Sequence, residues 1–512
     1  MSATSRATFA GRWHDAVASE HERPFLVFED DQGDIARWSY DEFDALVAAV
    51  AGGLRARGVR PGCAVHLALT NSPAFVATWL ATALLGAWVV PSDPKATAPE
   101  LAGHVARTRP VVGVCSRERA AVYAEGAAGG PEVVVVDEAD PAVAELVHAP
   151  VAWHDVARPS PRDRAAVMFT SGTTAAPKGV VVTQANYAFA GDVMAAAAGL
   201  RREHRQFVVL PMFHANAQYY SFASAISAGA SVALMHGFSA TGFLTQAARH
   251  RATHASLFAA PMRMMLARGA TPVDDVNLVH CWYAQNVTDD QYEELSTLLK
   301  CRPRQLYGMT ETIPAVLTNP ATRPIPNAMG VPTLGCDVDV RTPESNDPVD
   351  DGGVGEVVVR GVAGITLFDG YLDDPDTTAR SFRAGAFRTG DLARRDADGY
   401  LYFEGRRTDV LKVAGENVSV VEVEAVLSAH PAVLEAAIVG QPDEIRDEVP
   451  VGYVVQQPGK AEIRVEDLER WCEERLAKSK RPVRIVVVDE LPRTSVGKIR
   501  KFMLEQAARE HP

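Results

Sequence analysis

The spacing of apolar residues predicts a helix near the amino terminus. Between residues 43 and 54 the apolar side chains recur at intervals of three or four positions, which places them on one helix face. Ser39 and Glu42 precede this run in the pattern of a capping box, and Gly58 follows it. We therefore expect an amphipathic helix that ends before Gly58.

Short runs rich in β-branched residues then alternate with alanine-rich stretches of helical length. The runs lie at residues 65–69, 111–114 and 133–136, and such alternation is typical of parallel α/β sheets. Residues 74–90 form an uncharged run that is shorter than the roughly 20 residues a membrane span needs. We interpret this run as a buried helix that leads into a strand.

The pattern changes twice in the second half of the chain. Residues 331–402 contain short strand-like runs separated by turns rich in glycine and aspartate, which indicates a small β-rich subdomain. After Arg406, the expected elements are helices at residues 421–427 and 465–476 and strands at residues 436–439, 451–455 and 483–488. We predict an N-terminal domain over residues 1–405 and a C-terminal α/β domain over residues 406–512.

Composition excludes some classes of protein. The chain has 512 residues, of which 47% are hydrophobic and 22% are charged, as in globular proteins. The formal net charge of −13 opposes nucleic-acid binding, which needs a clustered basic face. Any anionic nucleotide must then be bound by local geometry.

Neither the cysteines nor the amino terminus indicates a secreted protein. The cysteines show no CxxC or Cys/His spacing, and we expect buried thiols in a reducing compartment at Cys63, Cys115, Cys281, Cys301, Cys336 and Cys472. The first 15 residues lack the apolar core of a signal peptide. We predict a soluble, cytoplasmic protein without a membrane span.

The strongest local signal is the run FTSGTTAAPKG at residues 169–179, between two strand-like segments. Its glycines free the backbone to turn N–H groups toward an anion. The residues that can join such an anion site are Thr170, Ser171, Gly172, Thr173, Thr174 and Lys178. The run is not a Walker A loop, because Gly179 follows the lysine where Ser or Thr would bind magnesium. A hydroxyl-rich surface turn is the alternative.

A second motif, YGMTET, begins at Tyr307. The aromatic ring of Tyr307 can stack on a flat base, and Gly308 lets the backbone lie close to a ligand. Thr310 can donate to a phosphate, and Glu311 offers the hard oxygen that Mg²⁺ prefers. A helix N-cap at Thr310 explains the same residues equally well.

Two further motifs carry single charged groups. Asp391, in the run TGD, can accept both hydroxyls of a ribose, and Arg406 can add a contact to the sugar or phosphate. Lys498 ends the glycine-containing run LPRTSVGK. Taken separately, turn chemistry explains the first two residues, and solvation explains the lysine.

Together and in this order, the motifs resemble the superfamily of acyl-CoA synthetases, peptide-synthetase adenylation domains and luciferases over about residues 10–503. The runs most similar to its carnitine and crotonobetaine CoA-ligase branch are FTSGTTAAPKGVVVT, LPMFHANAQYY, WYAQNVTDD, YGMTETI, AGENVSVVEVE and IRDEVPVGYVV. The resemblance implies a large N-terminal domain of two α/β subdomains plus a small β-barrel-like subdomain. A small, mobile α/β C-terminal domain completes the implied fold.

The resemblance also implies a reaction in two steps at one site. A small acid and ATP, with Mg²⁺, give acyl-AMP and pyrophosphate, and a thiol, expected to be coenzyme A, then displaces AMP. The implied roles are phosphate binding by residues 170–179, adenine stacking by Tyr307, α-phosphate contact by Thr310, Mg²⁺ binding by Glu311 and ribose binding by Asp391 with Arg406. Lys498 is implied to approach the acid carboxylate and the α-phosphate.

In the superfamily, the C-terminal domain moves between the two steps. The implied hinge is Thr408 beside Asp409. The implied thiolation loop contains Lys412, Gly415, Glu416 and Asn417.

The implied acyl pocket departs from the common family pattern. Its expected residues are His214, Asn216, Tyr219, Trp282, Tyr283 and Gln285. Residues 282–286 replace a small Gly-Gly-Ala stretch, and this bulk favours a compact polar or aromatic acid. Ala175 replaces a usual glycine in the phosphate loop but leaves each donor in place.

Other functions fit the same motifs. The acceptor can be a free-standing carrier protein or an amine, and the activated group can be a non-carboxylate oxyanion such as nitrite. A non-catalytic nucleotide-binding protein and a luciferase-type oxygenase are further alternatives. We expect a monomer or a homodimer.

Overall fold

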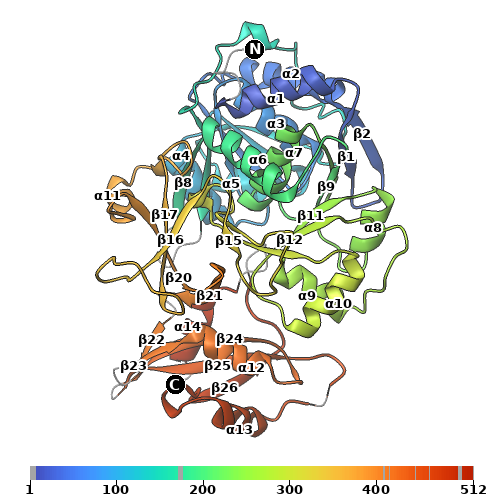
Figure 1. The fold of residues 1–512 in the computed structure, drawn as a ribbon. Helices are drawn as coiled ribbons and strands as arrows, with labels where there is room; N and C mark the ends of the chain where they lie inside the picture. The colour runs from blue at the N-terminus through green and yellow to red at the C-terminus, as the bar shows by residue number, and fades with distance from the viewer. Residues whose placement is uncertain are drawn as a thin grey trace. The chain divides into compact units, whose positions relative to one another are not determined.

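The structure is a computed structural model in which residues 7–170, 177–407, 410–413, 416–443, 446–460, 462–493 and 499–510 are described. The chain divides into two compact units, Met1–Val338 with Val359–Phe387 and Asp339–Val358 with Arg388–Pro512. The described strands form four sheets, and the order of the elements along the chain can be followed in Figure 1.

The first unit contains a nine-stranded sheet. Its strands, in spatial order, are β15 (Val331–Pro332), β14 (Leu317–Thr318), β13 (Arg304–Tyr307), β12 (His280–Ala284), β11 (His254–Phe258), β9 (Arg205–Val208), β10 (Ser231–Met235), β1 (Pro24–Glu29) and β2 (Ile35–Ser39). The strands from β13 to β1 are parallel, and β2, β14 and β15 are antiparallel to their neighbours. Because parallel strands place their carboxyl ends at one edge, the residues after β9, β12 and β13 leave the sheet at the same edge.

A seven-stranded sheet forms the other half of this unit. Its order is β18 (Gly370–Tyr371), β8 (Lys178–Thr183), β7 (Arg164–Thr170), β4 (Trp88–Pro91), β3 (Ala64–Ala68), β5 (Val112–Ser116) and β6 (Glu132–Val136). The strands from β7 to β6 are parallel, whereas β8 and β18 are antiparallel. The described residues on either side of the glycine-rich run therefore lie next to each other, at one end of the antiparallel pair β7–β8.

Helices cover both sheets of the first unit. They are α1 (Phe9–Glu20), α2 (Tyr40–Ala56), α3 (Pro73–Leu84), α4 (Ala98–Thr108), α5 (Ala120–Gly126), α6 (Gln184–Ala198), α7 (Ser224–Ala228), α8 (Phe243–Arg249), α9 (Ala259–Ala267), α10 (Asp289–Leu299) and α11 (Pro375–Arg380), with a π-helix, η4 (Asn216–Ala223). Helices α1, α2, α3, α6 and α7 gather in one layer (Figure 1). They share the main hydrophobic core with both sheets, while α8, α9 and α10 cover a second core.

The remaining strands form two five-stranded sheets. One contains β16 (Asp337–Arg341), β17 (Val354–Arg360), β20 (Ala386–Arg395), β19 (Phe382–Arg383) and β21 (Leu401–Arg406). The other, in the second unit, contains β23 (Glu416–Ser419), β22 (Val410–Val413), β25 (Asp447–Gln456), β24 (Val433–Asp443) and β26 (Arg484–Val488). Helices α12 (Val420–Ser428) and α13 (Val465–Arg475) pack with one core of this last sheet, and α14 (Lys501–Glu510) packs with another.

The elements expected from apolar spacing are confirmed. Helix α2 begins after Ser39, whose side chain and that of Glu42 make both hydrogen bonds of the capping box. The uncharged run is α3, buried at every position, followed by strand β4. No helix among the described residues is both long and apolar enough to cross a membrane.

The expectation of buried thiols holds for half of the cysteines. All six are free, and Cys115, Cys281 and Cys472 are buried. Cys63, Cys301 and Cys336 are half-buried instead, because each lies where the chain enters or leaves an element rather than within the core.

Glycines at two positions of the seven-stranded sheet region meet opposite surroundings. A Cβ added at Gly113 in β5 would lie 2.1 Å from the hydroxyl oxygen of Tyr123, so the strand accepts that ring only because the side chain is absent. Gly103, in the middle of α4, is exposed, and a Cβ there would meet no atom within 4 Å.

We predict that Gly113→Ala lowers the free energy of unfolding by about 3 kcal/mol, since the tyrosine must shift within a packed core. Gly103→Ala is the matched control and should raise stability by about 0.5–1 kcal/mol through helix propensity. Urea denaturation of both variants measures the difference. Equal stability of the two variants would contradict this account of Gly113.

Candidate functional site

The glycine-rich run lies at the open end of the β7–β8 pair. Phe169 pairs with Gly179, and Thr170 pairs with Lys178, in antiparallel register. Thr170 Oγ1 also lies 3.5 Å from the carbonyl oxygen of Lys178, to which it donates. Ser171, Gly172, Thr173 and Thr174 lie outside the described residues. The register therefore places Thr170 and Lys178 side by side at the described base of the run.

Lys178, Tyr371 and Glu311 form a cluster in the first unit. Lys178 Nζ lies 5.0 Å from the centroid of the Tyr371 ring, within the range of a cation–π contact. The Tyr371 hydroxyl donates to Glu311 Oε1 at 3.0 Å, and both side chains are buried. Burial and then the charge of Glu311 raise the pKa of Tyr371 above its usual value, so the phenol keeps its proton.

This cluster joins three distant segments of chain. Tyr371 is held in β18, where it pairs with Val180 of β8. Glu311 lies in a short 3-10 turn, η5 (Thr310–Thr312), and its carbonyl accepts from the N–H of Phe368 at 3.0 Å. Thr310, half-buried, begins the same turn. A buried carboxylate thus contacts β18, the strand that pairs with β8 and its Lys178.

Tyr307 and Gly308 end strand β13, at the edge where the parallel strands terminate. Tyr307 is half-buried. A Cβ added at Gly308 would lie 2.8 Å from the hydroxyl oxygen of Tyr220 and 2.9 Å from the Cα of Ala315. Only glycine lets the chain pass between these groups, and Tyr220 therefore belongs to this part of the molecule.

Residues 214–220 form the entrance and first turns of the π-helix η4. His214 is half-buried, and Asn216 and Tyr219 are buried. The Oδ1 atom of Asn216 is buried and accepts no hydrogen bond from the described residues. The Tyr219 hydroxyl donates to Met168 Sδ of β7 at 3.7 Å. Single turns of π-helix occur often at functional sites because they change the direction of side chains.

Strand β12 carries two of the expected pocket residues, Trp282 and Tyr283, and a third, Gln285, follows its last residue. Trp282 and Tyr283 are both buried, but alternation along the strand sends them to opposite faces and into different cores. The Trp282 ring lies 4.6 Å below the guanidinium of Arg304, and its Nε1 donates no hydrogen bond to the described residues. Gln285 is exposed with a φ of 72°. The structure thus places Trp282, not Tyr283, on the face shared with Tyr219.

In the second unit, Asp391 and Arg406 face each other across β20 and β21. Arg406 Nε donates to Asp391 Oδ1 at 2.9 Å, and Asp391 is buried. The part of strand β20 before Asp391 is held by Glu356, whose role the sequence did not indicate. This carboxylate, 1% exposed, accepts from Gly390 N at 3.0 Å and from Arg388 Nε at 2.7 Å.

The expected thiolation loop falls on the β22–β23 hairpin. Lys412 is exposed, pairs with Asn417, and its N–H donates to Glu448 Oε2 at 2.9 Å. Glu416 pairs with Val413. Gly415, the expected hinge residues Thr408 and Asp409, and Lys498 lie outside the described residues.

The residues present fit a magnesium nucleotide. The described residues contain no cluster of three or more His, Cys, Asp or Glu side chains placed for a metal ion. Mg²⁺ bound with phosphates takes only one or two carboxylates from protein. The buried side chain of Glu311, which accepts a hydrogen bond from Tyr371, offers one such carboxylate, and Lys178 offers a positive charge suited to a phosphate.

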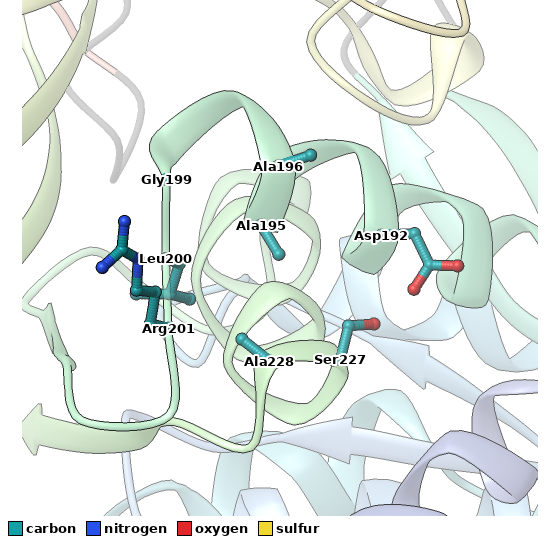
Figure 2. A pocket seen from close by; sticks show the side chains of 8 residues that line it. All are labelled: Asp192, Ala195, Ala196, Gly199, Leu200, Arg201, Ser227 and Ala228. Atoms are coloured by element: carbon teal, nitrogen blue, oxygen red, sulfur yellow. The ribbon is translucent and has the colours of Figure 1, made fainter.

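A separate surface pocket of about 330 Å³ lies between α6 and α7 (Figure 2). Figure 2 shows Asp192 and Ser227 at one end and Arg201 at the other. Asp192 is paired with Arg12. None of the residues expected from the sequence lines this pocket, so it is distinct from the groups described above.

Comparison with known proteins identifies the family. The AMP-binding enzyme model matches residues 13–372, and the model of the AMP-binding enzyme C-terminal domain matches residues 422–498. The chain belongs to the AMP-binding enzyme family and is an adenylate-forming ligase of the acyl-CoA ligase type.

Curated relatives and solved structures are similar to this protein over nearly its whole chain. The crotonobetaine/carnitine–CoA ligase of Salmonella arizonae is 31% identical over 510 residues, covering 96% of this chain and 98% of that protein. ATP-bound MatB from Rhodopseudomonas palustris has a TM-score of 0.87 at 25% identity, covering 98% of this chain and 99% of its own. A benzoate CoA ligase from Burkholderia xenovorans has a TM-score of 0.87 at 25% identity, covering 97% and 99%. The expected resemblance, enzyme class and α/β fold class are confirmed.

We predict that Tyr371→Phe lowers the free energy of unfolding by about 2 kcal/mol, because it removes a hydrogen-bond donor from a buried carboxylate. Tyr219→Phe is the matched control, since its hydroxyl donates only to a weak sulfur acceptor, and should change stability by less than about 0.5 kcal/mol. Chemical denaturation measures both. A loss at Tyr371 no larger than that at Tyr219 would argue against the Glu311 bond.

Proposed function

We propose that this protein is an acyl-CoA synthetase that activates a small polar or aromatic acid with MgATP and passes the acyl group to coenzyme A. The observation that carries the proposal is the cluster of Lys178, Tyr371 and Glu311 at the base of the glycine-rich run. It offers a cation for phosphate and a hard oxygen for magnesium in a family whose CoA ligases use ATP and CoA.

Adenylation solves the problem that a bare carboxylate has no usable leaving group. A carboxylate oxygen of the acid attacks the α-phosphorus, and pyrophosphate departs with the electrons of the broken P–O bond. Lys178 and Thr170 bind the departing phosphates, and Thr310 donates to the α-phosphate. Magnesium supplies positive charge to the phosphate oxygens when it is bound, with Glu311 as its protein ligand. Tyr371 keeps that carboxylate oriented.

Three charged residues and one aromatic residue have further roles in adenylation in the proposal. Asp391 accepts the ribose hydroxyls, and Arg406 orients it through the hydrogen bond at 2.9 Å. Tyr307 lies against adenine. Lys498 neutralises the charge that develops between the acid and the α-phosphate, which is the step at which a fixed cation lowers the barrier most.

Two buried polar atoms support a compact acid with a polar group. Asn216 Oδ1 and Trp282 Nε1 make no hydrogen bond with the described residues, although Asn216 is 6% and Trp282 1% exposed. Leaving such atoms unpaired costs free energy, and a ligand with its own donor or acceptor recovers it. In the proposal, the bulk of the buried Trp282 and Tyr219 side chains limits the length of the acid.

Transfer to the thiol follows in the same enzyme. The thiolate sulfur of coenzyme A attacks the acyl carbon, a C–S bond forms, and AMP leaves. We infer that residues 406–512 act as a mobile domain about Thr408 and Asp409. In the second step the loop containing Lys412, Gly415, Glu416 and Asn417 would approach the thiol. His214 and Gln285 would contact the acid.

ATP–pyrophosphate exchange tests the adenylation step. Carnitine, benzoate, anthranilate and nitrite are assayed with wild type, Lys498→Ala and the exposed-lysine control Lys460→Ala. We expect exchange with one acid, a loss of about 100-fold or more in Lys498→Ala, and no loss in Lys460→Ala. Mass spectrometry after addition of CoA should then find the thioester. Exchange with nitrite alone, or an acyl-AMP that reacts with no thiol, would overturn the proposal.

The pocket assignment predicts a change of specificity. Asn216→Leu keeps the side-chain size but removes the buried carbonyl oxygen. We expect the ratio of kcat/KM for anthranilate to that for benzoate to fall about tenfold, with the KM for ATP within about twofold of wild type. Steady-state kinetics with the two acids measures the ratio. An unchanged ratio would place Asn216 outside the acid pocket.

A further inference from the structure

Phe169, near the end of β7 at the base of the glycine-rich run, contacts strand β8 and the last turn of helix α4. It pairs with Gly179, and its ring covers that residue, since a Cβ added at Gly179 would lie 3.3 Å from Phe169 Cε1. The next residue along β7 is Thr170, and the residue before Gly179 is Lys178. The position of this ring therefore fixes where both phosphate-binding candidates leave the sheet.

Arg107, in the last turn of α4, makes three contacts in this region. Its guanidinium carbon lies 4.9 Å from the centroid of the Phe169 ring. Its two terminal nitrogens donate to the carbonyl oxygens of Pro177, at 2.6 Å, and Leu372, at 3.4 Å. Pro177 immediately precedes Lys178, and Leu372 immediately follows Tyr371. One planar, permanently charged group thus ties the strand ends on both sides of the Lys178–Tyr371 contact.

His104, one helical turn before Arg107, also contacts the Phe169 ring. The two rings are stacked with centroids 4.1 Å apart and planes 6° apart. His104 Nδ1 is hydrogen-bonded to Ser92 Oγ at 2.7 Å, which is bonded in turn to His66 Nε2 at 2.8 Å. His66 Nδ1 is bonded to the Tyr123 hydroxyl at 2.6 Å. This chain of bonds fixes the plane of His104 from the interior of the sheet.

The two histidines of this hydrogen-bonded chain are neutral, which allows His104 to lie beside Arg107. Burial lowers the pKa of His104 to about 4 and that of His66 to about 3. Both imidazoles are therefore uncharged at neutral pH, and the stacked histidine does not repel the guanidinium that contacts the same phenyl ring. The described phosphate loop base is thus braced by one cation and one neutral ring from α4.

We propose that Arg107 and His104 are positioning residues that hold Phe169 and Pro177 so that Thr170 and Lys178 meet the β- and γ-phosphates of ATP. The inference rests on the proposed function. Neither residue is expected to touch the nucleotide. Their contribution should therefore appear only with ligands that carry the two outer phosphates.

Calorimetric titration of the full-length protein with MgATP and, separately, with AMP tests the proposal. In Arg107→Ala, the Kd for MgATP should rise about tenfold, the loss expected for charge-assisted hydrogen bonds, while the Kd for AMP stays within about twofold. Arg302→Ala is the matched control, because Arg302 lies 5.1 Å from the Tyr292 ring in the same unit and pairs with Glu293. It should change neither Kd.

Two further variants keep the test decisive if Arg107→Ala folds poorly. Arg107→Lys retains the charge but not the planar pair of donors, and should weaken MgATP and not AMP. Phe169→Leu should also weaken the binding of MgATP and not that of AMP. The double variant with Arg107→Ala should raise the Kd for MgATP little further, because both substitutions remove the same contact between Arg107 and Phe169. Equal weakening of MgATP and AMP, or unchanged MgATP binding, would overturn the inference. If wild type binds both MgATP and AMP but the variants show no selective loss of MgATP binding, only the inference fails; if wild type binds neither nucleotide, the proposed function fails first.

Discussion

The antiparallel pairing of β7 with β8 is the constraint on which the candidate site depends. It sets Phe169 opposite Gly179 and Thr170 opposite Lys178. The outer edge of β8 is then free to pair with β18, which brings Tyr371 beneath Lys178 and against Glu311. A slip of one residue in this register would turn every side chain of β8 to the other face and separate the three groups.

Buried hydrogen bonds hold the residues of the candidate site in place. In the first unit, the side chains of Tyr123, His66, Ser92 and His104 form one neutral chain of hydrogen bonds. The second unit uses a different device, because the buried carboxylate of Glu356 meets Arg388 and the N–H of Gly390 before Asp391. In both units the residues proposed to meet the nucleotide are held by groups that do not meet it. Such support limits the reorganisation that binding requires.

Long, periodic elements were predictable from the sequence because their residues interact locally. The capping box at Ser39, the buried α3 and the alternation of the C-terminal strands and helices all appear as expected. The nucleotide motifs were also visible, since glycine, hydroxyl and charged residues cluster within a few positions. Tyr371, Glu356, Arg107 and His104 were not, because each acts across about 30 residues or more on a segment that its own neighbours do not indicate.

The sequence by itself determined the family, the α/β class and the residue types available for adenylation, because these follow from local spacing and from motifs in a fixed order. Only the tertiary structure decided which side chains meet. It sent Trp282 and Tyr283 of one strand into different cores, left Gln285 exposed, and placed Arg107 of α4 on Phe169. The physical reason is that strand pairing and core packing join segments far apart in the chain, and no local pattern records which segments those will be.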